Sequence, residues 1–273
     1  MGHDSGHDSG HDSGPKSRSR ALLIGLNYKH VLEERVLTGC INDVRNMADF
    51  LEREVGMNKK DITVITDQFP EDVCKATYEE LIFTLIKLGA ASWHEDLDFV
   101  VIHFSGHGRQ TPDLEGDEED GLDEGIVPVD YKQTGVLRDD RLLSLIKMFN
   151  PKTRVLCVFD CCHSGTILDL PFVWGGDGVK RKCGDDLVPA HVICLSAARD
   201  QDIAGEIHGG GNKERGAFTT YLLEELKEDI TVRILEFQRR INERLQKAGY
   251  DQVHVMSASR DIPTSLNLLE FLM

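Results

Sequence analysis

The stretches that decide the fold read LDFVVIHF at residues 97–104 and VLCVF at residues 155–159. Each is a short, nearly continuous run of apolar residues, many of them β-branched, with little polar alternation. Such runs are typical of strands that are buried on both faces, as in a parallel sheet covered by helices on each side. We therefore expect two core strands here.

Outward from these strands, apolar runs of strand length alternate with amphipathic stretches of helical length. Before residue 160 the expected further strands are 21–26 and 62–66, and the expected helices are 40–55, 78–88 and 139–149. After residue 190 we expect strands at 191–196 and 253–256 and helices at 217–227 and 232–247. This pattern predicts an α/β fold with a mostly parallel central sheet flanked by helices on both faces, and ligands at the carboxyl ends of its strands.

Two stretches interrupt this pattern. Residues 1–20 contain a Gly-His-Asp-Ser repeat followed by basic residues, and their polar, low-complexity composition predicts a disordered tail. Residues 176–190 carry glycines and a basic triplet, and we expect them to form a flexible basic linker rather than a helix or strand. We expect residues 21–175 and 191–273 to be the larger and the smaller region of one domain.

The composition excludes several classes of function. The 273 residues carry a formal net charge of −16, which disfavours nucleic acid and anionic membranes as partners and favours cationic ligands. No apolar run is long enough to cross a bilayer and no signal peptide is recognisable, so we expect a cytoplasmic or nuclear protein. The 7 cysteines show no zinc-site or disulfide spacing, which favours reduced thiols.

Both core strands end in residues that can do chemistry. One is followed by His107 between two glycines, and the other by the adjacent Cys161 and Cys162. A thiol nucleophile needs a nearby imidazole to form the thiolate and to protonate the leaving group, and the backbone N–H groups of Gly108 and Cys162 are candidates to bind the oxyanion. A single cysteine at a strand end is more often a small buried hydrophobic residue. The combination of both motifs favours catalysis.

These motifs, Ser105-Gly106-His107-Gly108 and Asp160-Cys161-Cys162-His163-Ser164-Gly165, resemble those of the metacaspases in order and spacing. The resemblance extends over most of the chain, in the type I arrangement of a large-subunit-like before a small-subunit-like region. It implies a caspase-like sandwich, a catalytic dyad of His107 and Cys162, and a monomer. Adjacent strand side chains point to opposite faces, so Cys161 and Cys162 have different roles, but alternation leaves open which of them faces the cleft.

The resemblance also implies a first substrate pocket formed by Cys40, Asp43, Ser105 and Asp160. Carboxylates in that pocket select a substrate arginine or lysine, whereas cleavage after aspartate would need cationic groups. Protein or peptide substrates with basic residues are therefore expected. For Asp43 a role at a helix N-terminus is an equally good interpretation.

Residues 113–124 contain eight carboxylates, whose repulsion a hard cation such as Ca²⁺ would relieve. The loop does not follow the EF-hand pattern, and an acidic solvated loop is an alternative interpretation. By resemblance, the calcium ligands are Asp123, Asp139, Asp140 and Asp169. A helix cap is another possible role for the pair Asp139 and Asp140.

The basic residues Lys180, Arg181 and Lys182 lie in the expected linker and are candidate sites of self-cleavage, although a solvated loop explains them equally well. The sequence thus predicts a calcium-dependent cysteine endopeptidase that cuts after arginine or lysine and processes its own chain. A catalytically silent, calcium-responsive scaffold is the alternative. The intact His107 and Cys162 argue against it.

Overall fold

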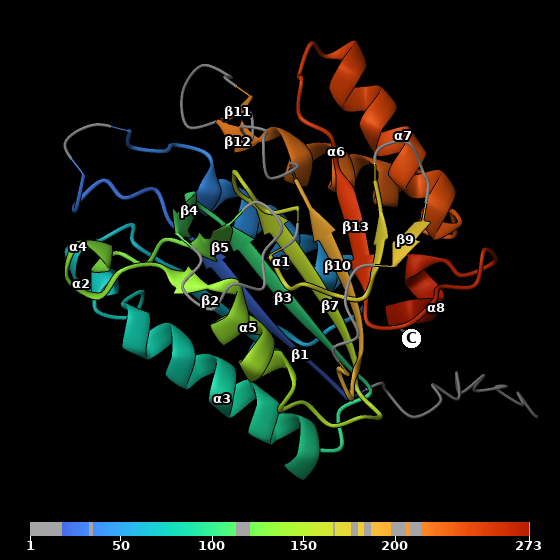
Figure 1. The fold of residues 1–273 in the computed structure, drawn as a ribbon, viewed down its shortest axis with the longest axis horizontal. Coiled ribbons are helices and arrows are strands. Elements are labelled where there is room, and N and C mark those ends of the chain that lie inside the picture. The colour runs from blue at the N-terminus through green and yellow to red at the C-terminus, as the bar shows by residue number, and fades with distance from the viewer. Residues whose placement is uncertain are drawn as a thin grey trace, which may run out of the picture.

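The computed structural model describes residues 18–32, 35–112, 121–165, 167–175, 180–182, 187–197, 206–207 and 214–272. Its centre is an eight-stranded sheet with the order β2-β1-β3-β7-β10-β13-β8-β9 (Figure 1). In chain order its strands are β1 (Ser19–Gly25), β2 (Ile62–Thr66), β3 (Phe99–Ser105), β7 (Arg154–Asp160), β8 (Phe172–Trp174), β9 (Lys180–Lys182), β10 (His191–Ser196) and β13 (Val255–Ala258).

Five strands of this sheet, from β2 to β10, run parallel, and β13, β8 and β9 complete it in antiparallel pairing. The prediction of a mostly parallel α/β sheet is therefore confirmed. Because β7 pairs with β10, the regions before and after residue 176 contribute strands to the same sheet. The carboxyl ends of the parallel strands meet along one edge, which is where an open α/β sheet places its ligands.

Helices cover both faces of the sheet (Figure 1). One face packs on the helices α3 (Tyr78–His94) and α5 (Asp139–Ile146), and the other packs on α1 (Cys40–Arg53), α6 (Ala217–Glu228), α7 (Ile234–Lys247) and α8 (Leu268–Leu272).

Strand β3 supplies side chains to both layers of the core. Val100, Ile102 and Phe104 enter the cluster beneath α3 and α5, and Phe99 and Val101 enter the cluster beneath α1 and α6. Every residue of β3 is buried. Burial of each large apolar side chain contributes roughly 1.5–3 kcal/mol. This two-sided burial is why the sequence of β3 is continuously apolar.

Sequence patterning missed a small sheet beside the main one. It consists of β4 (Gly108–Pro112), β5 (Leu122–Ile126) and β6 (Leu137–Arg138), in that order. The described part of the chain also contains short elements: a 3-10 helix (Lys59–Asp61), α2 (Pro70–Val73), α4 (Tyr131–Thr134), β11 (Glu206–Ile207) and β12 (Arg215–Gly216). Strands of two to five residues that carry charged side chains have too little apolar alternation to be recognised from sequence.

The expected tail, residues 1–20, ends earlier than predicted. Strand β1 begins at Ser19, and Arg20 forms ion pairs with Glu95 and Asp61. Arg18 pairs with Asp96 in the same way. These contacts tie the basic residues to the folded domain, while residues 1–17 lie outside the described residues.

The prediction that residues 176–190 form no regular element is wrong for Lys180–Lys182. They form β9, which pairs antiparallel with β8, with Arg181 opposite Val173. The edge of β8 offers unpaired backbone N–H and C=O groups, and a following segment satisfies them whatever its side chains. None of the helices in the described ranges combines the length and the apolar composition that a bilayer crossing requires.

Candidate active site

The predicted catalytic residues follow the ends of the neighbouring strands β3 and β7, which end at paired positions of the sheet. Ser105 at the end of β3 is paired in register with Asp160 at the end of β7, and the N–H of Gly106 donates to the carbonyl of Asp160 at 3.3 Å. His107 lies two residues beyond Ser105, and Cys162 lies two residues beyond Asp160. The strand register therefore brings the two loops out of the sheet side by side.

Gly108 lies directly against the cysteine loop. A Cβ atom at this position would be 1.9 Å from the carbonyl oxygen of Cys162 and 3.2 Å from Sγ of Cys161. A contact of 1.9 Å is impossible for a side chain, so the backbones touch here only because residue 108 is glycine. The two predicted oxyanion donors, Gly108 and Cys162, are thus neighbours in space.

The structure separates the roles of the two adjacent cysteines. Cys161 is buried in the core layer beneath α3 and α5, and burial raises the pKa of its thiol well above the ordinary value. Cys162 is partly exposed. Since only a thiolate is a good nucleophile, Cys161 is unsuited to that role, and Cys162 is the accessible thiol. His163, the next residue, has a φ of 52°, so the chain turns sharply after Cys162.

The imidazole of His107 is oriented by a backbone carbonyl. Its Nε2 lies 2.7 Å from the carbonyl oxygen of Arg35. A carbonyl accepts but never donates, so this hydrogen bond places the proton of the neutral ring on Nε2 and makes Nδ1 the basic nitrogen. The contact of Arg35 with His107 could not be predicted from the sequence, because a backbone carbonyl on a distant loop has no side-chain signature.

The predicted substrate-binding carboxylates meet at the N-terminus of α6. The N–H of Gly216 donates to both oxygens of Asp43 at 3.0 Å, and the N–H of Thr219 donates to Asp160 at 2.9 Å. The hydroxyl of Ser105 also donates to Asp43, at 2.8 Å. Asp43 lies in the first turn of its own helix α1, as the alternative interpretation had it, and it also accepts at the start of α6, where Asp160 joins it.

This acidic group is shielded from solvent. Asp43 is 0% exposed and Asp160 is 5% exposed, and the fourth predicted pocket residue, Cys40, is buried in the first turn of α1. A Cβ at Gly216 would lie 2.2 Å from Asp160 and 2.9 Å from Asp43, so only glycine fits between the two carboxylates. A cavity of about 560 Å³ lies elsewhere, between β2 and α3, and no predicted site residue lines it.

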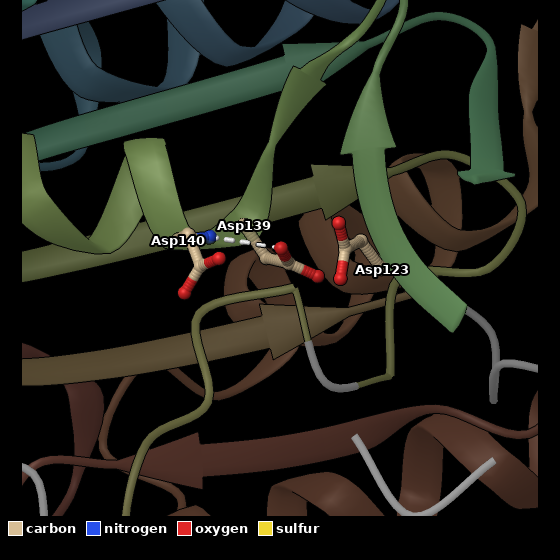
Figure 2. A group of neighbouring side chains, drawn as sticks. All are labelled: Asp123, Asp139 and Asp140. Carbon is tan, nitrogen blue, oxygen red and sulfur yellow. Dashed lines mark hydrogen bonds between the residues drawn. The ribbon is translucent and has the colours of Figure 1, made fainter. Parts of the chain in front are cut away.

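Three of the four predicted calcium ligands gather at one place. Asp123 comes from β5, and Asp139 and Asp140 begin α5, so that their carboxylates face a common space (Figure 2). Each offers an oxygen within 4.8 Å of the others. Asp169, whose φ of 42° marks a tight turn after the cysteine loop, is not part of this group of three.

Burial opposes the negative charge of this carboxylate cluster. Burial raises the pKa of Asp139 to about 7. The hydrogen bonds that Asp139 accepts from the N–H groups of Asp140 and Glu124 lower its pKa, but by less than burial raises it. Arg138 forms an ion pair with Asp123 and offsets part of the charge. Carboxylate oxygens at this spacing are the ligands that Ca²⁺ prefers, so the residues fit that ion. Residues 113–120, which carry most of the acidic loop, lie outside the described residues.

Residues 19–171, which contain both strand ends and the carboxylate cluster, match the model of the family described as metacaspase, peptidase C14 domain. The chain belongs to the metacaspases. It is 34% identical over 260 residues to Metacaspase-1B of Aspergillus fumigatus, covering 93% of this chain and 58% of the relative. It is 39% identical over 166 residues to Metacaspase-1A of Neurospora crassa, covering 60% of this chain and 36% of the relative. The metacaspase chain thus spans less than two thirds of the length of these relatives.

Solved structures support the caspase-like fold of this metacaspase. Protein GSU0716 from Geobacter sulfurreducens is similar with a TM-score of 0.63 and 25% identity, covering 92% of this chain and 97% of the other. Caspase-1 from Spodoptera frugiperda is similar with a TM-score of 0.51 and 13% identity, covering 89% and 86%. The second likeness concerns the fold alone. The prediction of a caspase-like sandwich is confirmed.

The contact between Gly108 and Cys162 predicts a clear contrast between two glycine substitutions. Gly108→Ala should lower the unfolding free energy by about 1–3 kcal/mol, because the added methyl group must push the cysteine loop away. Gly89→Ala, in the middle of α3, has 3.6 Å to its nearest neighbour and should stabilise the protein by about 0.5–1 kcal/mol. Urea denaturation of both variants tests this, and equal stability of Gly108→Ala and wild type would contradict the close packing.

Proposed function

We propose that this metacaspase is a cysteine endopeptidase in which His107 activates Cys162. The observation that carries the proposal is the register of Ser105 with Asp160, which sets both residues at the same height on adjacent strands. A partly exposed cysteine on a loop that contacts the glycine after His107, together with an imidazole whose Nε2 is held by a carbonyl, has the parts that nucleophilic catalysis needs.

The chemistry follows from the tautomer of His107. Nδ1 takes the proton of the Cys162 thiol, and the thiolate attacks the carbonyl carbon of the scissile peptide bond. The backbone N–H groups of Gly108 and Cys162 are the proposed donors to the resulting oxyanion, and the imidazolium returns its proton to the leaving amine. A water molecule, deprotonated by the same imidazole, then hydrolyses the thioester. The carbonyl of Arg35 stabilises the imidazolium by accepting from Nε2.

The proposed preference is for arginine or lysine before the scissile bond. Asp43 and Asp160 converge within 2.9 Å of one point at Gly216, Ser105 donates to Asp43, and Cys40 lies in the same helical turn as Asp43. Two buried carboxylates repel a substrate aspartate and attract a guanidinium or ammonium group. Because the carboxylates are shielded, a substrate side chain reaches them only when the segment at Gly216 moves.

Peptide cleavage tests the reaction and the preference together. We expect cleavage of a fluorogenic peptide ending in arginine to exceed that of its aspartate counterpart by about 100-fold, since the latter buries like charges together. Cys162→Ala should lower kcat by at least about 1,000-fold, whereas Cys74→Ala, at an exposed cysteine, should leave it unchanged. No cleavage of either peptide, with Cys162 unreactive toward a thiol probe, would favour the scaffold instead.

We further propose that Ca²⁺ binds Asp123, Asp139 and Asp140, with Asp169 as the fourth ligand implied by resemblance. A cation bound by these oxygens would offset the cost of burying Asp139 and the smaller repulsion from its carboxylate neighbours. Asp169 follows the cysteine loop by a few residues, so binding would favour the ordered form of the cleft wall. The ion would supply charge to the loops and would not contact the thiol.

Calorimetric titration with Ca²⁺ tests this site independently of activity. Asp140→Asn should weaken binding by about tenfold or more, because one ligand charge is lost while the side chain keeps its shape. Asp49→Asn, at an exposed position on α1, is the matched control and should bind as the wild type does. If the wild type bound no calcium, the proposed site would be rejected. If cleavage were unchanged in the presence of a chelator, the proposed calcium dependence of activity would be rejected.

Self-cleavage near Lys180, Arg181 or Lys182 is a third proposal. These residues form β9, the edge strand of the main sheet, which pairs with β8 alone among the described strands. A protease cleft binds substrate in an extended conformation, so β9 would have to separate from β8 before it could be cleaved. Substituting all three by glutamine should abolish the fragments formed on calcium addition, as measured by mass spectrometry. The exposed pair Lys59 and Lys60, substituted in the same way, serves as the control. Identical fragments from the triple variant would place cleavage elsewhere.

A further inference from the structure

Tyr28 is a buried residue that the catalytic proposal does not use, although it touches His107. It lies in the loop after β1, is 0% exposed, and its ring centroid is 4.8 Å from that of the His107 imidazole. Burial raises the pKa of Tyr28 well above the ordinary value, so the side chain carries an intact hydroxyl. Such a hydroxyl both donates and accepts one or more hydrogen bonds.

The hydroxyl of Tyr28 lies at the end of the ladder between β4 and its partner β5, where it bridges the residue before β4 and the residue after β5. The pairing of Gly108 with Ile126 continues to His107 and Val127, and the N–H of Val127 donates to the carbonyl of His107 at 3.0 Å. In a regular hydrogen-bonded antiparallel pair, His107 would return a bond from its N–H to the carbonyl of Val127. Instead, the N–H of His107 donates to Oη of Tyr28 at 3.0 Å, and Oη donates to the carbonyl of Val127 at 2.7 Å.

A second set of contacts holds Tyr28 itself in place. Its backbone has a φ of 61°, which is unusual for a bulky residue. The carboxylate of Asp67, which is 1% exposed, accepts from the N–H groups of Asn27 and Tyr28. A Cβ at Gly106 would lie 2.9 Å from Oη, so the glycine before His107 makes room for the hydroxyl. The loop that carries Tyr28 is thus held on one side by Asp67, which follows β2, and on the other by its contact with Gly106, which follows β3.

From this geometry we infer that Tyr28 is a positioning residue for His107, whose hydroxyl spaces β4 from β5 and thereby sets the direction of the imidazole. The inference rests on the proposed role of His107 as the base. A phenylalanine would fill the same core volume and keep the ring contact, but it would leave the N–H of His107 and the carbonyl of Val127 without the bridge. The two strands would then close to a direct bond, or the N–H would stay unpaired, and in either case the imidazole moves.

The test compares Tyr28→Phe with Tyr131→Phe, which removes the hydroxyl of a half-buried tyrosine on α4. Steady-state cleavage of the arginine peptide and the pH profile of Cys162 alkylation by iodoacetamide are measured, with peptide mapping to separate Cys162 from the exposed Cys74. For Tyr28→Phe we expect kcat to fall about tenfold with KM nearly unchanged. The alkylation profile should shift upward by about half a pH unit or more, because a displaced imidazole stabilises the thiolate less.

Wild-type values for Tyr28→Phe in both measurements would overturn the inference, and so would an equal loss in Tyr131→Phe. Should Tyr28→Phe fail to fold, 3-fluorotyrosine at position 28 keeps the ring and the hydroxyl but weakens the oxygen as an acceptor. It should shift the profile in the same direction, and an unshifted profile would overturn the inference as well. Failure of the proposed function is distinguishable, because the wild type would then not cleave or His107→Ala would retain full activity.

Discussion

The parallel pairing of β3 with β7 is the constraint on which the site depends. Both strands are buried between two helical layers, so neither can slip by one residue without turning its apolar side chains to the wrong layer. The register sets Ser105 beside Asp160. The histidine loop and the cysteine loop begin directly after these two residues, so the pair fixes where both loops leave the sheet. Glycine at position 108 then lets the histidine loop close on the cysteine loop at a distance that no other residue permits.

Acidic side chains are stabilised in two physically different ways around this centre. Asp43 and Asp160 are buried, but backbone N–H groups at the start of α6 and the hydroxyl of Ser105 stabilise their charge. The group of Asp123, Asp139 and Asp140 relies partly on Arg138, and burial raises the pKa of Asp139 to about 7. The first arrangement is the proposed pocket for a basic side chain, and the second is the proposed site of a cation, which would offset the cost of burying these carboxylates.

The described loops form one continuous support for the histidine. Asp67 next to β2 holds the backbone of Tyr28, Tyr28 bridges His107 to β5, and Arg35 accepts from the imidazole. The carboxylate cluster shares strand β5 with this support, through Asp123 at one end and Val127 just past the other. The acidic cluster and the support of His107 therefore share a single strand.

The core strands and the main helices followed from the sequence, because strands buried on both faces have continuous apolar runs. The candidate catalytic residues also followed from it, because glycine, histidine and cysteine at strand ends are chemically distinctive. The short strands β4, β5 and β9 did not, since backbone pairing rather than side-chain pattern holds them. Only the tertiary structure decided that Cys161 faces the core while Cys162 is accessible, that Asp43 and Asp160 meet at α6, and that Arg35 and Tyr28 orient His107. Each of these features depends on contacts between segments that are far apart in the chain. Some of the contacts are made by backbone atoms, which are the same for nearly every residue type and therefore cannot be recognised in a sequence.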